Sequence, residues 1–259
     1  MPLFDSHCHF DFPAFDSGRA LLWAQCQAAG VKRMLVPAVR LAAFAHQAEV
    51  GASLAGCCAA YGLHPWWQAE HQQADLAQLA TWLARPECVA VGECGLDLAI
   101  DGADLAHQLA LLHGQLQLAV EFKLPLILHV RKAHQPLLQA LAHYKLPRGG
   151  VLHAFSGSLE LAASYARHGL KLGIGGTITY ERAAKTRAAV AQMPLDWLLL
   201  ETDAPAMPLS GFQGQANSPL QLPLLLAELA QLRQMDAQPL AEALWANSCA
   251  LFARDPLSV

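Results

Sequence analysis

The chain has 259 residues, of which 54% are hydrophobic and only 15% are charged, a composition that excludes a disordered protein and allows a large core. The length fits either one large domain or two small ones, because α/β barrels of about 250 residues commonly form one domain. The formal net charge is −4 and no basic block exceeds two residues, which argues against binding nucleic acid by surface electrostatics alone. If the protein binds phosphates, divalent cations must supply much of the positive charge.

Seven cysteines are scattered along the chain without a CxxC pair, which excludes a zinc ribbon and a thioredoxin-type site. The first ten residues lack the basic and apolar regions of a signal peptide. No apolar run approaches the ~18 residues that span a membrane. We therefore expect a soluble, cytoplasmic protein with reduced thiols and no membrane contact, and the sequence names no protein partner.

Short apolar runs of strand length alternate along the chain with longer runs of helical period. A clear helical run covers residues 105–122, where Leu105, Leu109 and Leu112 recur at three- and four-residue intervals. Another covers residues 18–29. The expected strands are residues 3–7, 33–37, 58–63, 88–93, 126–130, 150–154, 170–175 and 197–202.

Eight strands that are apolar on both faces, mostly followed by helices, predict a parallel sheet covered all round. At this length the economical arrangement is a (β/α)8 TIM barrel, formed as a single domain by residues 1–259. The alternative is a doubly wound open sheet. The Pro- and Gly-rich segment 204–219 follows the eighth strand and is expected to form a loop on the active face.

The first candidate site is the pair His7 and His9, two residues apart at the end of the first predicted strand. Side chains alternate across a strand, so both imidazoles point the same way and Cys8 points oppositely. A strand-borne pair often places two imidazoles on one metal, although alone it fits ordinary strand histidines equally well. Cys8 is expected to be a packing residue.

Other ligand-type residues follow four later apolar runs, at the point where each run stops. In a (β/α)8 barrel these strand ends meet at the C-terminal face, where catalytic residues from different strands converge. Four histidines and two carboxylates suit a pair of divalent ions such as Zn²⁺, Mn²⁺, Ni²⁺ or Fe²⁺, and a more oxygen-rich half suits Mg²⁺. The predicted metal ligands are His7, His9, Glu93, His129, His153 and Asp203.

Both carboxylates of this set are also predicted to be catalytic. Glu93 is the candidate for a bridge, because two ions about 3.5–4 Å apart need a shared ligand. The end of strand four offers no lysine, so a carboxylated lysine is not expected. Asp203 is the candidate base, which accepts a proton from the attacking water and passes it to the leaving group.

Further residues are expected around the metals. By strand alternation Asp5 shares a face with the two N-terminal histidines and Glu201 shares one with Asp203; each either orients an imidazole or makes an ordinary buried hydrogen bond. His64 ends the third strand and is expected to contact substrate. Arg131 is expected at the rim, where it holds a phosphate or carboxylate of the substrate or forms a structural salt bridge.

A basic pair, Arg182 and Lys185, lies beyond the seventh strand. It either adds to the positive field of the site or forms solvated helix surface.

Six ordered blocks carry a resemblance to a known family. They are DSHCHFD (5–11), GLHP (62–65), VGECGLD (91–97), LHVR (128–131), LHAFSG (152–157) and LLETDAP (199–205). Over nearly the whole chain the sequence resembles the TatD family of metal-dependent hydrolases, in particular its YjjV-like branch. Residues 175–180 and 211–215 look like signatures of that branch. The resemblance implies a TIM barrel with two divalent metals, related to DNases that attack phosphodiester bonds, and it assigns the same six metal ligands.

The chain departs from the family pattern at residues 216–219, which read Ala-Asn-Ser-Pro. Family members usually have Arg-Asn-Glu-Pro or Asn-Arg-Pro there. The lost charge removes support for substrate contacts from this loop, but not for the metal site.

The leading hypothesis for function is a phosphodiesterase, most specifically a 3′-5′ exodeoxyribonuclease acting on DNA through a metal-activated water. The alternative is a two-metal hydrolase of a small amide, lactone or phosphoester, because such a water attacks carbonyl and phosphoryl centres alike. A binding or scaffold protein with a vestigial site is disfavoured, because all six ligand types are present.

Overall fold

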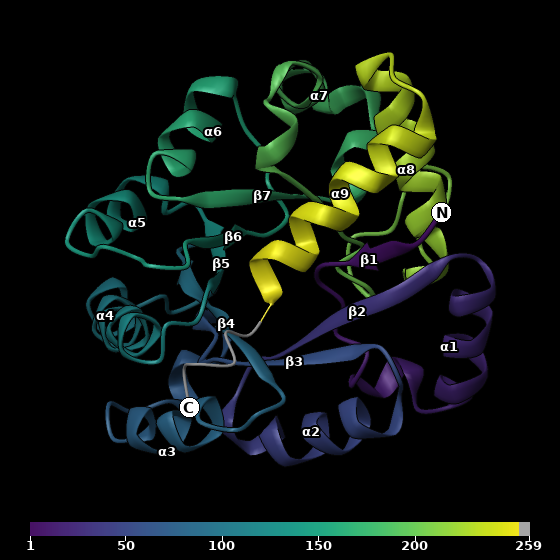
Figure 1. The fold of residues 1–259 in the computed structure, drawn as a ribbon. Helices are drawn as coiled ribbons and strands as arrows, with labels where there is room; N and C mark the ends of the chain where they lie inside the picture. The colour runs from purple at the N-terminus through teal and green to yellow at the C-terminus, as the bar shows by residue number, and fades with distance from the viewer. Residues whose placement is uncertain (254–259) are drawn as a thin grey trace.

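The computed structural model describes residues 1–253, in which eight parallel strands pair in sequence order and curve into a barrel (Figure 1). The first and last strands meet where the N–H of Ser6 donates to the carbonyl of Leu200 at 3.0 Å and the N–H of Asp203 donates to that of His7 at 2.8 Å. The strands are β1 Leu3–Asp5, β2 Val31–Ala38, β3 Cys57–Tyr61, β4 Cys88–Asp97, β5 Leu126–Arg131, β6 Gly150–Leu152, β7 Leu170–Ile174 and β8 Leu198–Leu200.

Helices cover the outer face of this barrel, and the last of them crosses one of its ends (Figure 1). The α-helices are α1 Arg19–Ala28, α2 Phe44–Ser53, α3 Asp75–Leu83, α4 Leu105–Glu121, α5 His134–Leu141, α6 Leu159–Ala166, α7 Ala184–Gln192, α8 Leu222–Arg233 and α9 Ala237–Phe252. Short 3₁₀ turns are η1 Pro13–Phe15, η2 Leu41–Ala43, η3 Pro65–Glu70, η4 Gly176–Thr179, η5 Glu181–Ala183, η6 Leu195–Trp197 and η7 Pro219–Gln221. None of the helices within residues 1–253 is both long and apolar enough to cross a membrane.

The TIM-barrel expectation is confirmed, because the strand order never reverses as it does in a doubly wound sheet. A small buried cluster draws its strand residues from β1 to β6 and β8, and it therefore fills the barrel interior. The Phe4 ring of this cluster contacts Trp245 and Phe252 of α9 at centroid distances of 6.1 and 5.8 Å. This contact places α9 across the N-terminal end, and a larger apolar cluster packs the helices against the outer face.

Strand β4 differs from the expectation, because it runs past Glu93 and ends at Asp97. Its pairing with β5 shifts between Val91, which pairs with Leu126, and Cys94, which pairs with Leu128, so β4 carries one extra residue. Such a β-bulge re-aims a side chain, and bulges are frequent beside active sites. Glu93 therefore owes its direction to a bulge within a strand and not to a strand end. The apolar pattern could not show this, because a bulge leaves hydropathy unchanged.

The expectation that Asp5 shares a face with His7 and His9 is wrong. Strand β1 ends at Asp5, so the alternation does not reach the two histidines. The Asp5 carboxylate accepts hydrogen bonds from the N–H and hydroxyl of Thr202, at 2.9 and 2.6 Å, and from the N–H of His7 at 3.3 Å. Asp5 thus makes the ordinary buried hydrogen bonds of the second interpretation, and they join the end of β1 to the segment after β8.

This closure gives a stability prediction for Thr202→Val, which keeps the side-chain shape but leaves one oxygen of buried Asp5 without its hydroxyl donor. We expect the free energy of unfolding to fall by about 1–3 kcal/mol. Urea unfolding in the presence of a chelator measures it. The matched Thr202→Ser variant keeps the hydroxyl and should stay within about 1 kcal/mol of the native protein. Equal losses in the two variants would contradict the assigned bond.

Candidate metal centre

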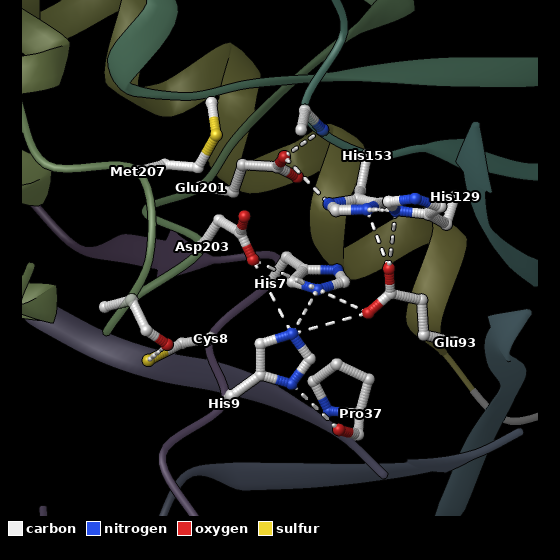
Figure 2. A network of polar contacts seen from close by, with 12 residues as sticks. His7, Cys8, His9, Pro37, Glu93, His129, His153, Glu201, Asp203 and Met207 are labelled. Carbon is white, nitrogen blue, oxygen red and sulfur yellow. Dashed lines mark hydrogen bonds and ion pairs between the residues drawn. The ribbon is translucent and has the colours of Figure 1, made fainter. Parts of the chain in front are cut away.

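The Glu93 carboxylate lies at the centre of the converging side chains, between two pairs of imidazoles (Figure 2). Its Oε2 atom lies 3.1 Å from Nε2 of His7 and 3.4 Å from Nε2 of His9. Its Oε1 atom lies 2.7 Å from Nε2 of His153 and 3.3 Å from Nδ1 of His129. Each oxygen of one carboxylate therefore faces a different set of possible metal ligands.

Asp203 completes the set that contains the two N-terminal histidines. Its Oδ1 atom lies 3.6 Å from Nε2 of both His7 and His9. All six predicted ligands are buried except the half-buried His129. Among residues 1–253, three groups have ligand atoms within 4.8 Å of one another: His7 with His153 and Asp203, His7 with His9 and Glu93, and His64 with Glu93 and His129.

Two of the imidazoles have an acceptor outside the centre that fixes which nitrogen faces inward. Nδ1 of His9 lies 3.3 Å from the carbonyl oxygen of Pro37, and Nε2 of His129 lies 3.2 Å from a carboxylate oxygen of Asp97. Donation of the outer N–H leaves a lone pair on the inner nitrogen, the usual arrangement of metal-bound histidines.

Sequence reasoning missed the position of Asp97. A signal was available, because VGECGLD ends in a carboxylate on the strand next to His129.

The donor set of this centre fits divalent cations. Oε2 of Glu93 is buried and receives no hydrogen bond, although two imidazole nitrogens lie within 3.4 Å of it. A buried carboxylate oxygen without a donor is costly unless a cation compensates it. Imidazole and carboxylate groups whose ligand atoms converge within 4.8 Å match the ligands of Zn²⁺, Mn²⁺ or Fe²⁺.

The ionisation of the cluster favours cation binding. Burial alone would raise the pKa of Glu93, but His153, His64 and His7 hold it well below its usual range, so the group is a carboxylate. Burial lowers the pKa of His7 to about 4, so this imidazole is neutral and able to bind a metal. Burial opposes protonation of His153 as well, yet the Glu93 charge outweighs it and raises that pKa to about 10. Metal uptake would displace this proton.

His64 lies against Glu93, with Nε2 3.0 Å from Oε1. Its Nδ1 accepts a hydrogen bond from the N–H of Trp66 at 3.0 Å, which places the imidazole hydrogen on Nε2. Burial lowers the pKa of His64 to about 4, so the ring is neutral. In this tautomer His64 donates to Glu93 and has no lone pair for a metal; substrate contact stays a prediction.

The remaining predicted residues lie around this centre. Oε1 of Glu201 accepts a hydrogen bond from the N–H of Ala154 at 2.5 Å and lies 3.9 Å from Nδ1 of His153, too far to orient that ring by a hydrogen bond. Burial raises the pKa of Glu201 to about 8. Arg131 ends β5 and is exposed, and among residues 1–253 no hydrogen bond or ion pair holds its guanidinium.

Cys8 and the loop after β8 have structural contacts. Cys8 is fully buried in the outer apolar cluster, with Sγ 3.6 Å from the carbonyl oxygen of Ala204. In the segment that departs from the family pattern, the Asn217 side-chain amide donates to the carbonyls of Thr202 at 2.8 Å and Met207 at 3.1 Å. This segment therefore holds the loop that carries Asp203.

Comparison with known proteins agrees with this geometry. The model of the TatD-related DNase family matches residues 4–253. The chain belongs to this family. An Escherichia coli protein named uncharacterized metal-dependent hydrolase YjjV is 46% identical over 250 residues, covering 96% of each chain. The crystal structure of YjjV, a TatD homologue from Escherichia coli, matches with a TM-score of 0.94 at 45% identity over 98% of each chain.

A Cronobacter turicensis protein named 3′-5′ ssDNA/RNA exonuclease TatD is 35% identical over 264 residues, covering 98% of each chain. The resemblance inferred from the six sequence blocks is thus confirmed, together with the expectation of a metal-dependent hydrolase of the TatD family.

The contact between Asp97 and His129 gives a prediction for metal affinity. Asp97→Asn removes the charged acceptor of the outer imidazole N–H, and loss of such a partner typically weakens metal binding by about 10- to 100-fold. Titration of chelator-stripped protein with Mn²⁺ or Zn²⁺ measures it. Asp101→Asn removes the same charge from an exposed residue nearby and serves as control. Identical isotherms for the two variants would show that Asp97 does not support the ligand.

Proposed function

We propose that this chain hydrolyses phosphodiester bonds of single-stranded nucleic acid from the 3′ end, with DNA as the expected substrate and two divalent cations as cofactors. The observation that carries the proposal is the placement of Glu93, whose two oxygens face separate sets of ligand atoms. A shared carboxylate of this kind is typical of two-metal sites that cleave phosphoesters. The exonuclease name of the Cronobacter relative supports the substrate class.

The residues divide between two ions. His7, His9 and Asp203 would hold one ion, His129 and His153 would hold the second, and Glu93 would serve both. When bound, the two ions would supply Lewis acidity toward the phosphoryl group and lower the pKa of a water molecule.

The chain's own groups would then position the substrate and move the proton. An oxygen of Asp203, the least buried carboxylate of the set, would accept the proton of the attacking water and return it to the departing 3′ oxygen. His64 would keep its Nε2–H on Glu93 or turn it to the substrate. The free guanidinium of Arg131 would hold a phosphate oxygen pair at the rim.

The proposal also includes a single-domain organisation and a location in the cytoplasm. The barrel accounts for residues 1–253, which supports a single functional domain. The six cysteines other than Cys88 form no disulfide, and most of them are buried, which supports a reducing compartment such as the cytoplasm.

The direct test uses metal-free protein reloaded with Mn²⁺, Mg²⁺ or Zn²⁺ and mixed with 5′-labelled single-stranded DNA. We expect a ladder that shortens from the 3′ end, lost on chelation and restored by metal. Elemental analysis of the same samples reports occupancy, and parallel RNA, lactone and amide substrates set the specificity. Uncut nucleic acid at full occupancy, with a lactone or amide turned over, would overturn the nuclease proposal in favour of a small-molecule hydrolase.

The role of Asp203 is tested by Asp203→Asn, which keeps the side-chain shape but removes the proton acceptor. Loss of a positioned base typically costs 10²- to 10⁴-fold, and we expect kcat to fall by about that much. Metal content must be measured on the same sample, so that loss of the ion is separated from loss of the base. Native kcat in the metal-loaded variant would refute the assignment.

A further inference from the structure

Two arginines differ from the others in residues 1–253, because their guanidinium groups make no hydrogen bond or ion pair with the protein. The other arginines are held by carboxylates, carbonyls, thiols or a hydroxyl. The two are Arg131, which ends β5, and Arg182, which lies in the turn after β7. Arg131 lies at the carboxyl end of its strand and Arg182 follows that of β7, and these ends form the face of the barrel that carries the metal centre.

A cavity of about 240 Å³ lies beside Arg182, between the loops that follow β7 and β8. Tyr180 and Arg182 line it from the first loop, and Met207 and Pro208 line it from the second. No carboxylate belongs to its lining. The Tyr180 hydroxyl donates to the carbonyl of Pro208 at 2.7 Å, and this hydrogen bond joins the two loops on either side of the cavity.

The cavity adjoins the candidate metal centre. Met207 is four residues beyond Asp203, so their Cα atoms are separated by at most ~14 Å of extended chain. The Asn217 amide bonds the carbonyls of both Thr202 and Met207, which holds the cavity wall against the segment that carries Asp203. Figure 2 shows Met207 on the side of the centre where Glu201 and Asp203 lie. One extended ligand can therefore reach both places.

The chemistry of the lining suits a nucleotide. The Arg182 guanidinium lies 4.5 Å from the centroid of the Tyr180 ring, a cation–π contact that leaves its N–H groups free. An unpaired guanidinium binds a phosphate by two parallel hydrogen bonds. Met207, a flexible apolar side chain, is 37% exposed and offers a surface for a base. Positive charge at this point matters in a protein whose net charge is −4.

We propose that the cavity between the loops after β7 and β8 is a subsite for a nucleotide unit of single-stranded nucleic acid, adjacent to the bond that is cleaved. Arg182 binds the phosphate of this unit, and Tyr180 and Met207 contact its sugar and base. The proposal rests on the proposed nuclease function and adds the place where the strand is held beyond the metals.

The test compares Arg182→Gln with Lys185→Gln, a matched loss of one positive charge three residues away. Lys185 does not line the cavity, and its charge acts on Glu160 of α6. Both variants are assayed as metal-loaded full chains on 5′-labelled single-stranded DNA of two to six nucleotides and on bis(4-nitrophenyl) phosphate. Metal content and thermal unfolding verify that both remain folded and loaded.

We expect KM for the longer oligonucleotides to rise about 10- to 100-fold in Arg182→Gln, the usual effect of losing a hydrogen bond to a charged group. The loss in kcat/KM should be at least tenfold larger on these oligonucleotides than on bis(4-nitrophenyl) phosphate. The gain in kcat/KM with strand length should shrink in this variant. Lys185→Gln should stay within about twofold of the native enzyme on every substrate.

Two outcomes would overturn the subsite, and they are distinguishable. If the native enzyme degrades DNA but Arg182→Gln matches Lys185→Gln at every length, the nuclease function stands and the subsite is wrong. If the native enzyme, with its metals present, cleaves no oligonucleotide, the proposed function fails and the subsite fails with it. Equal losses on bis(4-nitrophenyl) phosphate and on oligonucleotides would also reject the subsite, because the effect would then lie in the metal centre.

Discussion

The arrangement of the barrel mouth depends on one carboxylate that is buried among imidazoles and whose charge must be compensated. Glu93 is 1% exposed, and withdrawing a carboxylate from water costs several kcal/mol unless positive charge and hydrogen bonds compensate for it. Imidazoles on four segments surround its two oxygens, yet Oε2 has no hydrogen-bond donor. Divalent cations would supply the remaining compensation. The buried carboxylate would thus link the stability of the barrel mouth to metal binding.

The barrel provides what this arrangement needs. The bulge in β4 turns Glu93 into the mouth, and the hydrogen bonds from Thr202 to Asp5 fix the first segment against the last. Helix α9 covers the N-terminal end of the barrel with apolar side chains, so the interior core is closed at the end opposite the candidate metal centre. Ligand residues that are distant in sequence are then held close together at the barrel mouth.

The sequence predicted the barrel and the convergence of ligand-type side chains at its mouth, but it did not predict how each side chain is positioned. Apolar runs report burial on both faces of a strand, which is why all eight strands and the convergence of their ends could be inferred. The alternation rule failed for Asp5, because β1 ends before His7. The apolar pattern could not show that Glu93 lies in a bulge, because the positive φ angles of Gly92 and Gly95, near +145°, do not affect hydropathy. The outer partner of His129 depends on the register between β4 and β5, which hydropathy does not show.

The sharing of Glu93 by two metal ions, as we propose it, can be tested directly. The most direct measurement is anomalous diffraction from crystals of the chelator-stripped protein reloaded with Mn²⁺. We expect two peaks about 3.5–4 Å apart, each next to one oxygen of Glu93, with His7 and His9 at one peak and His129 and His153 at the other. A single peak at full metal saturation, or two peaks of which one does not contact Glu93, would show that Glu93 is not shared.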